Sequence, residues 1–191
     1  MMLGYSLLTA LCLTGVAPDG APLTSAQLET IWANFNAIDD EGTHLARAGM
    51  KRMVAAPDLA VPFLRDKLKP VKAPDAATLD KLLEELDSND FKTREQANQS
   101  LEKLGVLALG ALKDRLKENP GSLEAKNRMT RLIDHAERAT VSAEELRAVR
   151  GIFVLRAIGG SDAKSALEAL AKGADETVVT RQARKALATM K

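Results

Sequence analysis

The stretch VPFLRDKL at residues 61–68 recurs without a gap as LGALKDRL at residues 109–116. Two leucines and an aspartate keep their places, and basic residues flank the aspartate in both copies. A third copy, KSALEALAKG at residues 164–173, keeps the leucines and loses the aspartate. The matched positions of the first two copies are Leu64 with Leu112, Asp66 with Asp114 and Leu68 with Leu116. The spacing of these leucines is typical of one face of a helix.

Two further patterns recur around this stretch in the same order, at a spacing of about 50 residues. The first is a pair of apolar residues three apart, followed by glycine in two of the three copies. The copies are Met50 and Met53, then Leu101 and Leu104 before Gly105, then Leu155 and Ile158 before Gly159. The second is an apolar stripe at i, i+3, i+4 and i+7; it comprises Leu79, Leu82, Leu83 and Leu86, then Met129, Leu132, Ile133 and Ala136, then Ala183, Ala186, Leu187 and Met190. Each stripe gives a helix a single face to bury.

These patterns predict a unit of three helices that is present three times. The predicted helices are 42–56, 58–69 and 75–87, then 90–104, 106–118 and 122–138, then 143–158, 161–172 and 175–190. An additional helix near 25–38 would cap the exposed face of the first unit. We expect each unit to stack on the next one along the chain, because a three-helix unit cannot bury its apolar stripe alone.

The residues between the patterns predict where helices begin. The sequences Thr24-Ser-Ala-Gln27 and Ser142-Ala-Glu-Glu145 are typical capping boxes. Three aspartates stand at expected N-caps, and a proline is expected in the first turn of the helix at 58–69, where its missing N–H is tolerated. These residues are Asp58, Asp75, Asp90 and Pro62.

The composition agrees with an all-helical protein. The chain has 191 residues, of which 31 are Ala and 28 are Leu, and only 3% are aromatic. Alanine and leucine favour helices, and β-branched runs are nearly absent, which argues against a sheet protein. One cysteine excludes a disulfide framework and a cysteine-based metal cage.

The segment from Leu3 to Ala17 contains no charged residue. Its 15 residues would span about 22 Å as a helix, which is too short for a stable membrane span and suits the apolar part of an export signal. We therefore expect residues 1–21 to be an export signal-like segment and residues 22–191 to be the helical domain. The protein would be exported, either periplasmic or secreted, or tethered by the uncleaved segment; a core helix is the alternative interpretation.

Residues 90–116, DFKTREQANQSLEKLGVLALGALKDRL, resemble a HEAT repeat. They have a charged opening with an arginine, an alanine four residues before a leucine, Leu-Gly at the turn and a second helix with spaced leucines. Across residues 25–190, the order of AAPDLAVPFLRDKLKPVKAPD, LDSNDFKTREQA, VSAEELRAVRGIFVLRAIGG and TRQARKAL is similar to the HEAT-like segment that follows WD-repeat propellers in certain bacterial multidomain proteins.

The resemblance implies a HEAT- or armadillo-like, right-handed α-solenoid that acts as a scaffold or a protein-binding surface. It carries over no catalytic residue and implies no cofactor. The family pattern places a propeller ahead of this segment, whereas here the preceding residues are the apolar stretch and a helix containing Trp32.

Few residue patterns in the sequence point to catalysis or metal binding. His44 and His135 have no partner at metal-binding spacing, so we expect surface or partly buried histidines and no metal site. The acidic run ending at Asp90 fails as a calcium loop because it lacks the required glycine and glutamate. Gly159-Gly160-Ser161 before a helix could bind an anion, but a helix end running into a helix start is the more common interpretation.

Charge is distributed unevenly along the chain. Residues 19–90 carry a net charge of −5 and residues 91–191 carry +6. The candidate partner-binding basic face comprises Arg128, Arg131, Arg138, Arg147 and Arg150, with His135 beside the first three. One interpretation is that these side chains are solvent-exposed and form ion pairs with nearby carboxylates, as surface arginines ordinarily do. The functional interpretation is that they form a docking site for an acidic partner. Nucleic acid is not expected, because the chain is not basic overall and its basic part has no Tyr or Trp for stacking.

Three functions remain open at this point. The leading one is a non-enzymatic, exported repeat scaffold that binds a protein partner. The second is a HEAT-like lyase or glycosylase-type enzyme, or its accessory subunit, which would act through aromatic residues and an acid in the concave groove. The third is a subunit that folds stably only within a larger assembly.

Overall fold

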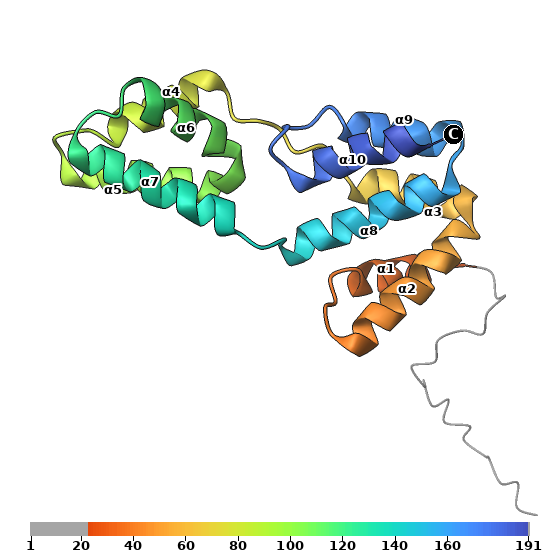
Figure 1. The fold of residues 1–191 in the computed structure, drawn as a ribbon. Coiled ribbons are helices and arrows are strands. Elements are labelled where there is room, and N and C mark those ends of the chain that lie inside the picture. The colour runs from red at the N-terminus through yellow and green to blue at the C-terminus, as the bar shows by residue number, and fades with distance from the viewer. Residues whose placement is uncertain (1–22, 191) are drawn as a thin grey trace, which may run out of the picture.

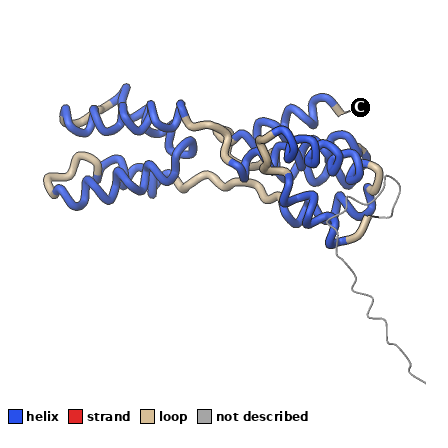
Figure 2. The backbone as a smooth tube through the Cα atoms, turned by 90° about the horizontal axis from the view of Figure 1, so that it is seen from below, coloured by secondary structure: helices blue, strands red, loops and turns tan. Residues whose placement is uncertain are grey.

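The structure, a computed structural model, describes residues 23–190. Every regular element in this range is a helix, and the range contains no strand (Figure 2). The all-α prediction is therefore confirmed, whereas the predicted export segment at residues 1–21 lies outside the described residues. The elements are α1 (Ser25–Asn34), α2 (Asp40–Val54), α3 (Pro57–Lys67), α4 (Ala76–Glu85), α5 (Phe91–Leu104), the 3-10 helix η1 (Gly105–Ala108), α6 (Leu109–Glu118), α7 (Leu123–Arg138), α8 (Ala143–Ile158), α9 (Gly160–Leu170) and α10 (Val178–Thr189).

Most helices begin where the sequence predicts. Both capping boxes form: the side chains of Thr24 and Ser142 accept from the backbone N–H three residues on, and Gln27 and Glu145 accept in return from the cap backbone. Asp75 and Asp90 also cap their helices, α4 and α5.

Two predictions about α3 are wrong. The helix begins at Pro57, and Ala56 stands at the N-cap with no side-chain hydrogen bond, so Asp58 lies inside the first turn. Proline has no N–H to leave unpaired and its fixed φ suits the first helical position, which explains the earlier start. Pro62 consequently falls in the second turn rather than the first, with its ring on the exposed face.

The described helices form two bodies, each with its own hydrophobic core (Figure 1). The four-helix body comprises α4 to α7, and its core contains leucines from α4, α5 and α6 packed on Met129 and Leu132 of α7. The six-helix body comprises α1 to α3 and α8 to α10, and its core contains Phe35, Leu64 and Leu155.

Within the six-helix body, the first and third predicted units pack directly against each other. Helix α8 contacts α2, α3, α9 and α10, and α1 contacts α2 and α3. The approach of α8 is close: a Cβ added at Gly151 would lie 3.1 Å from Leu68 and 3.3 Å from both Leu64 and Trp32. Glycine at position 151 thus lets α8 approach α3.

The expected stacking of each unit on the next one along the chain is therefore not the observed arrangement. Helix α4, predicted as the third helix of the first unit, packs on α5 and α6 instead, where Leu83 and Leu86 are buried. With α4 in the other body, the apolar faces of α2 and α3 are covered by α8, and the middle unit lies to one side (Figure 1).

Two linkers join the bodies, residues 68–75 and residues 139–142 (Figure 2). The first linker is fastened to the six-helix body, because the backbone N–H of Ala174 donates to the oxygen of Val71 at 2.7 Å.

Candidate protein-binding surface

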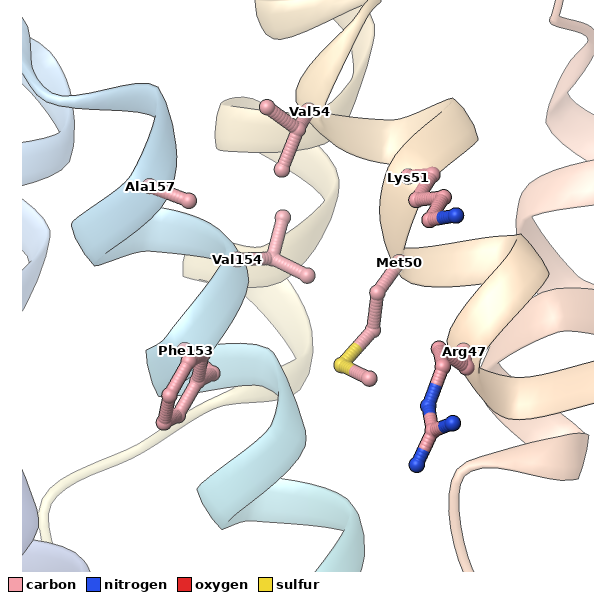
Figure 3. A pocket seen from close by; sticks show the side chains of 7 residues that line it. All are labelled: Arg47, Met50, Lys51, Val54, Phe153, Val154 and Ala157. Carbon is pink, nitrogen blue, oxygen red and sulfur yellow. The ribbon is translucent and has the colours of Figure 1, made fainter. Parts of the chain in front are cut away.

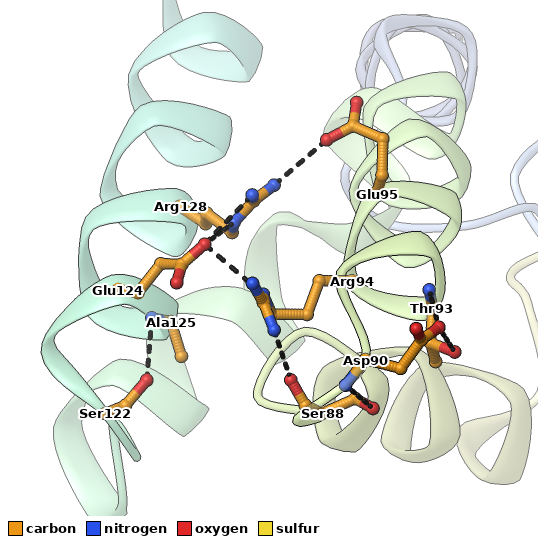
Figure 4. A network of polar contacts seen from close by, with 9 residues as sticks. All are labelled: Ser88, Asp90, Thr93, Arg94, Glu95, Ser122, Glu124, Ala125 and Arg128. Carbon is orange, nitrogen blue, oxygen red and sulfur yellow. Dashed lines mark hydrogen bonds and ion pairs between the residues drawn. The ribbon is translucent and has the colours of Figure 1, made fainter.

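Arg128, the first residue of the predicted basic face, joins two helices of the four-helix body (Figure 4). Its guanidinium lies 3.0 Å from Glu124 on α7 and 3.3 Å from Glu95 on α5, and its side chain is only 14% exposed. The hydrogen bond from Arg128, followed by the nearby charge of Arg94, lowers the pKa of Glu124 below its usual value. Arg128 is thus committed to internal ion pairs.

Arg147 and Arg150 tie α8 to the end of α1. Arg147 lies 2.9 Å from Glu144 and its guanidinium carbon is 5.7 Å from the centre of the Trp32 ring. Arg150 donates to the backbone oxygens of Phe35 and Ala37 at 2.9 and 2.8 Å. Phe35 is the C-cap of α1 and Ala37 lies just beyond it, so Arg150 supplies donors to carbonyl groups that lie past the regular hydrogen bonds of the helix.

Arg131 and Arg138 are exposed on α7. Arg131 donates to the backbone oxygen of Asn127, and Arg138 forms a 3.4 Å pair with Asp134 on the same helix. The five predicted arginines therefore lie in two bodies, and three of them are held in internal contacts. Both histidines, His44 and His135, are exposed, as expected.

A polar groove of about 440 Å³ lies between α5 and α7. Its residues are Glu95, Asn98, Glu102, Arg128, Arg131, Leu132 and His135. An acidic partner would meet two carboxylates there as well as the two arginines. No aromatic residue lines this groove, whereas the enzyme alternative requires aromatic side chains and an acid in one groove.

The Gly159-Gly160-Ser161 turn is a helix end running directly into a helix start. Gly159 ends α8 with φ 69°, and α9 begins at Gly160 with φ 74°. The hollow beside the turn is lined by two carboxylates, Asp58 and Asp162, and by one cation, Arg65, so its lining has no net positive charge to favour an anion.

An apolar groove of about 280 Å³ lies between α2 and α8 of the six-helix body (Figure 3). Met50 and Val154 point into the space between the two helices. The residues that line the groove are Arg47, Met50, Lys51 and Val54 from α2, and Phe153, Val154 and Ala157 from α8. Phe153 is 55% exposed, although a phenyl ring gains free energy when it is removed from water.

A second groove of about 250 Å³ shares Phe153 with the first one. It lies between α8 and α10, and its residues are Val149, Ile152, Phe153, Arg156, Gln182, Lys185 and Ala186. The guanidinium carbon of Arg156 lies 4.8 Å from the centre of the Phe153 ring. We call the residues that line these two grooves the Phe153 surface.

Four cations lie around the Phe153 surface, which contains no carboxylate. They are Arg47, Lys51, Arg156 and Lys185. Within residues 23–190, none of the four has a carboxylate oxygen within 4.0 Å. These cations, and not the arginines picked out by the sequence, combine exposure, freedom from ion pairs and a neighbouring apolar groove.

Two other features are absent from the described part of the chain. Between residues 23 and 190, no cluster of three or more His, Cys, Asp or Glu side chains is placed to hold a metal ion. No helix in the same range combines the length and apolar character needed to cross a membrane. Comparison with protein families, curated proteins and solved structures finds no match to this chain.

Proposed function

We propose that this protein is a non-enzymatic helical scaffold that binds a partner protein through the Phe153 surface. The observation that carries the proposal is one exposed phenylalanine between an apolar groove and a second groove of mixed lining, surrounded by four cations that form no ion pair within residues 23–190. An exposed apolar patch with a polar rim marks interaction sites, and aromatic and arginine side chains contribute much of the binding energy at such sites.

The proposal includes a HEAT-like repeat architecture. In support, the matched leucines of the repeated stretch, Leu64 and Leu112, are both fully buried in equivalent helices, α3 and α6. We infer that α2 and α3 with α8 to α10 form a short, right-handed HEAT-like stack, and that the four-helix body is a further unit set beside it. An experimental structure in which α2–α3 and α5–α6 fail to superimpose would contradict this architecture.

We also propose that the protein is exported. The support is the uncharged stretch from Leu3 to Ala17. Fractionation of the native host, with intact mass of the purified protein, would show both the compartment and whether the leader is cleaved. Recovery of the full-length chain from the cytosol alone would contradict export.

Site-specific photocrosslinking tests the binding role. A photoreactive phenylalanine analogue at position 153 of the full chain, introduced in the native host, should form a crosslink to a discrete partner protein. The matched control is the same analogue at Phe91, which is 64% exposed in the four-helix body and also has an arginine over its ring. Absence of a crosslink from position 153, or identical products from both positions, would reject the proposed function.

A further inference from the structure

We propose that the Phe153 surface binds an acidic amphipathic helix of the partner. The apolar stripe of that helix would lie along the groove between α2 and α8, and its carboxylates would meet the four surrounding cations. The inference rests on the proposed function and adds the chemistry of the partner.

The shape of the groove favours a helical ligand. On α2 the lining residues follow i, i+3, i+4 and i+7, from Arg47 to Val54, and on α8 they follow i, i+1 and i+4, from Phe153 to Ala157. The groove thus runs along α2 for about two turns, or roughly 10 Å, and along α8 for about one turn, or roughly 6 Å. A third helix presents side chains at the same three- and four-residue spacing, so its apolar side chains fit between those of α2 and α8.

The floor of the groove can adapt to such side chains. Met50 points between the two helices and is only partly buried (Figure 3). Methionine has an unbranched, polarisable side chain that repacks readily, and it is common at surfaces that receive apolar helices. Phe153 stands beside the groove and would be covered by the incoming helix.

The charges favour an acidic ligand. Arg47 and Lys51 lie on the α2 side of Phe153, and Arg156 and Lys185 lie on the side of α10. Because four cations and no carboxylate line the two grooves, the lining contributes only positive charge, and glutamates on both flanks of a bound helix would each meet a cation. The polar groove of the four-helix body lacks this character, because Glu95 and Glu102 lie inside it.

The same charges disfavour two other occupants. A second copy of the protein that used this surface in a symmetric dimer would place cations against cations. The stretch from Leu3 to Ala17 of the chain itself has no charge to offer to the four cations. An acidic helix from another protein satisfies both the apolar groove and its charged rim.

Two labelled peptides test the inference on the full chain. One is a helical peptide of about 18 residues (~27 Å) with a leucine stripe and glutamates on both flanks, and its twin has lysine in place of each glutamate. Fluorescence anisotropy should show that the glutamate peptide binds at least about tenfold more tightly than the lysine peptide, and that the difference shrinks as salt is added.

Charge reversal of the chain supplies the decisive comparison. The Arg47→Glu/Lys51→Glu variant should bind the glutamate peptide about tenfold or more weakly and should bind the lysine peptide better than the unmodified protein does. A variant that merely misfolds loses binding to both peptides, so improved binding of the lysine peptide identifies direct contact. Arg131→Glu/Arg138→Glu, a matched double change at exposed arginines of α7, should leave both affinities unchanged.

The contribution of Phe153 is tested by a pair of variants, one at Phe153 and one at the control residue Phe91. Phe153→Glu should abolish binding of the glutamate peptide, and Phe91→Glu should not alter it. Equal binding of the two peptides, weakening by the α7 double change, or preference for anionic phospholipid vesicles over the glutamate peptide would overturn the inference. If position 153 crosslinks to a partner but the protein binds the two peptides equally, the proposed binding role holds and the acidic helix is rejected. If the protein prefers the glutamate peptide but no partner is crosslinked, the proposed binding role is rejected.

Discussion

Arg150 satisfies two backbone oxygens at the end of α1 from a helix that lies more than 110 residues further along the chain. Hydrogen bonds from a charged donor contribute about 1.5–3 kcal/mol each, and the oxygens left behind would lose their partners. Arg150→Ala should therefore lower the free energy of unfolding by about 2–4 kcal/mol.

Urea unfolding followed by circular dichroism checks this expectation. The matched control is Arg138→Ala, because Arg138 is 81% exposed and its one ion pair within residues 23–190 is with Asp134 one turn away, a contact worth about 0.3–0.5 kcal/mol. Equal losses in the two variants would show that Arg150 does not act through the oxygens of α1.

Gly159 adopts a backbone conformation that side chains disfavour, with φ 69° and ψ −159°. Nothing lies within 4 Å of a Cβ added there, so the cost of Gly159→Ala is conformational and should be about 1–3 kcal/mol. Gly110→Ala is the control, because position 110 lies in α6, where alanine is favoured by up to ~1 kcal/mol and a Cβ finds ordinary contact distance. Thermal unfolding should move in opposite directions; a stabilised Gly159→Ala protein would contradict the backbone argument.

At the scale of a helix, the aspartate caps of α4 and α5 make the four-helix body sensitive to acid. The hydroxyl and then the backbone N–H of Thr78 donate to Asp75 and lower its pKa below the usual 3.8, and Thr93 does the same for Asp90. The unfolded chain therefore binds more protons than the folded chain as the pH falls from 3.8. The stabilisation is complete above that pH and is lost below it, as the lowered pKa values are passed.

Replacement of the caps by asparagine tests this dependence. Asn caps a helix about as well as Asp but does not titrate, so Asp75→Asn/Asp90→Asn should flatten the acid loss of stability. The urea midpoint of the helical signal, measured near pH 5 and again below pH 3.8, gives the comparison. An equally steep acid loss in the variant would mean that other carboxylates control it.

Helix positions could be predicted because their signals are local. The capping boxes at Thr24 and Ser142 and the apolar stripes lie within one or two turns, so the sequence contains the whole pattern. Three ion pairs of the predicted arginines were also local, because Glu124, Asp134 and Glu144 stand three or four residues before their partners; the pair of Arg128 with Glu95 joins two helices and is not local. The ordinary interpretation of a paired face thus applies to three of the five arginines.

At the scale of the molecule, the two cores predict two units of stability. Leu112 and Leu155 are buried equally, one in each body, and Leu→Ala at either position should cost about 2–5 kcal/mol. Leu112→Ala should speed hydrogen exchange in α4 to α7 alone. Leu155→Ala should speed it in α8 to α10 and also in α1 to α3, which share its core.

Hydrogen exchange monitored by mass spectrometry, peptide by peptide, distinguishes these patterns. Faster exchange over all of the residues 23–190 in both variants would mean that the chain unfolds as a single unit.

Which helices pack against one another could not be predicted from the sequence. An apolar stripe shows that a helix has a face to bury, and it does not show which face will cover it. Nothing local distinguishes α4 packed on α3 from α4 packed on α5, and the choice decides that α8 covers α2. The Phe153 surface depends on that choice, since Met50 and Phe153 lie about 100 residues apart in sequence and meet only because α8 lies beside α2.

The exposed linker after α3 has a practical consequence. Lys72 is accessible there and Ala73 follows it, so trypsin can cleave the backbone between the bodies after Lys72, whereas the bond after Lys69 resists cleavage because Pro70 follows it. The resulting fragments would remain associated, because α1 to α3 on one fragment and α8 to α10 on the other share one hydrophobic core. Two co-expressed polypeptides divided at this site should therefore reassemble by complementation, which would make the protein a natural candidate for a split reporter.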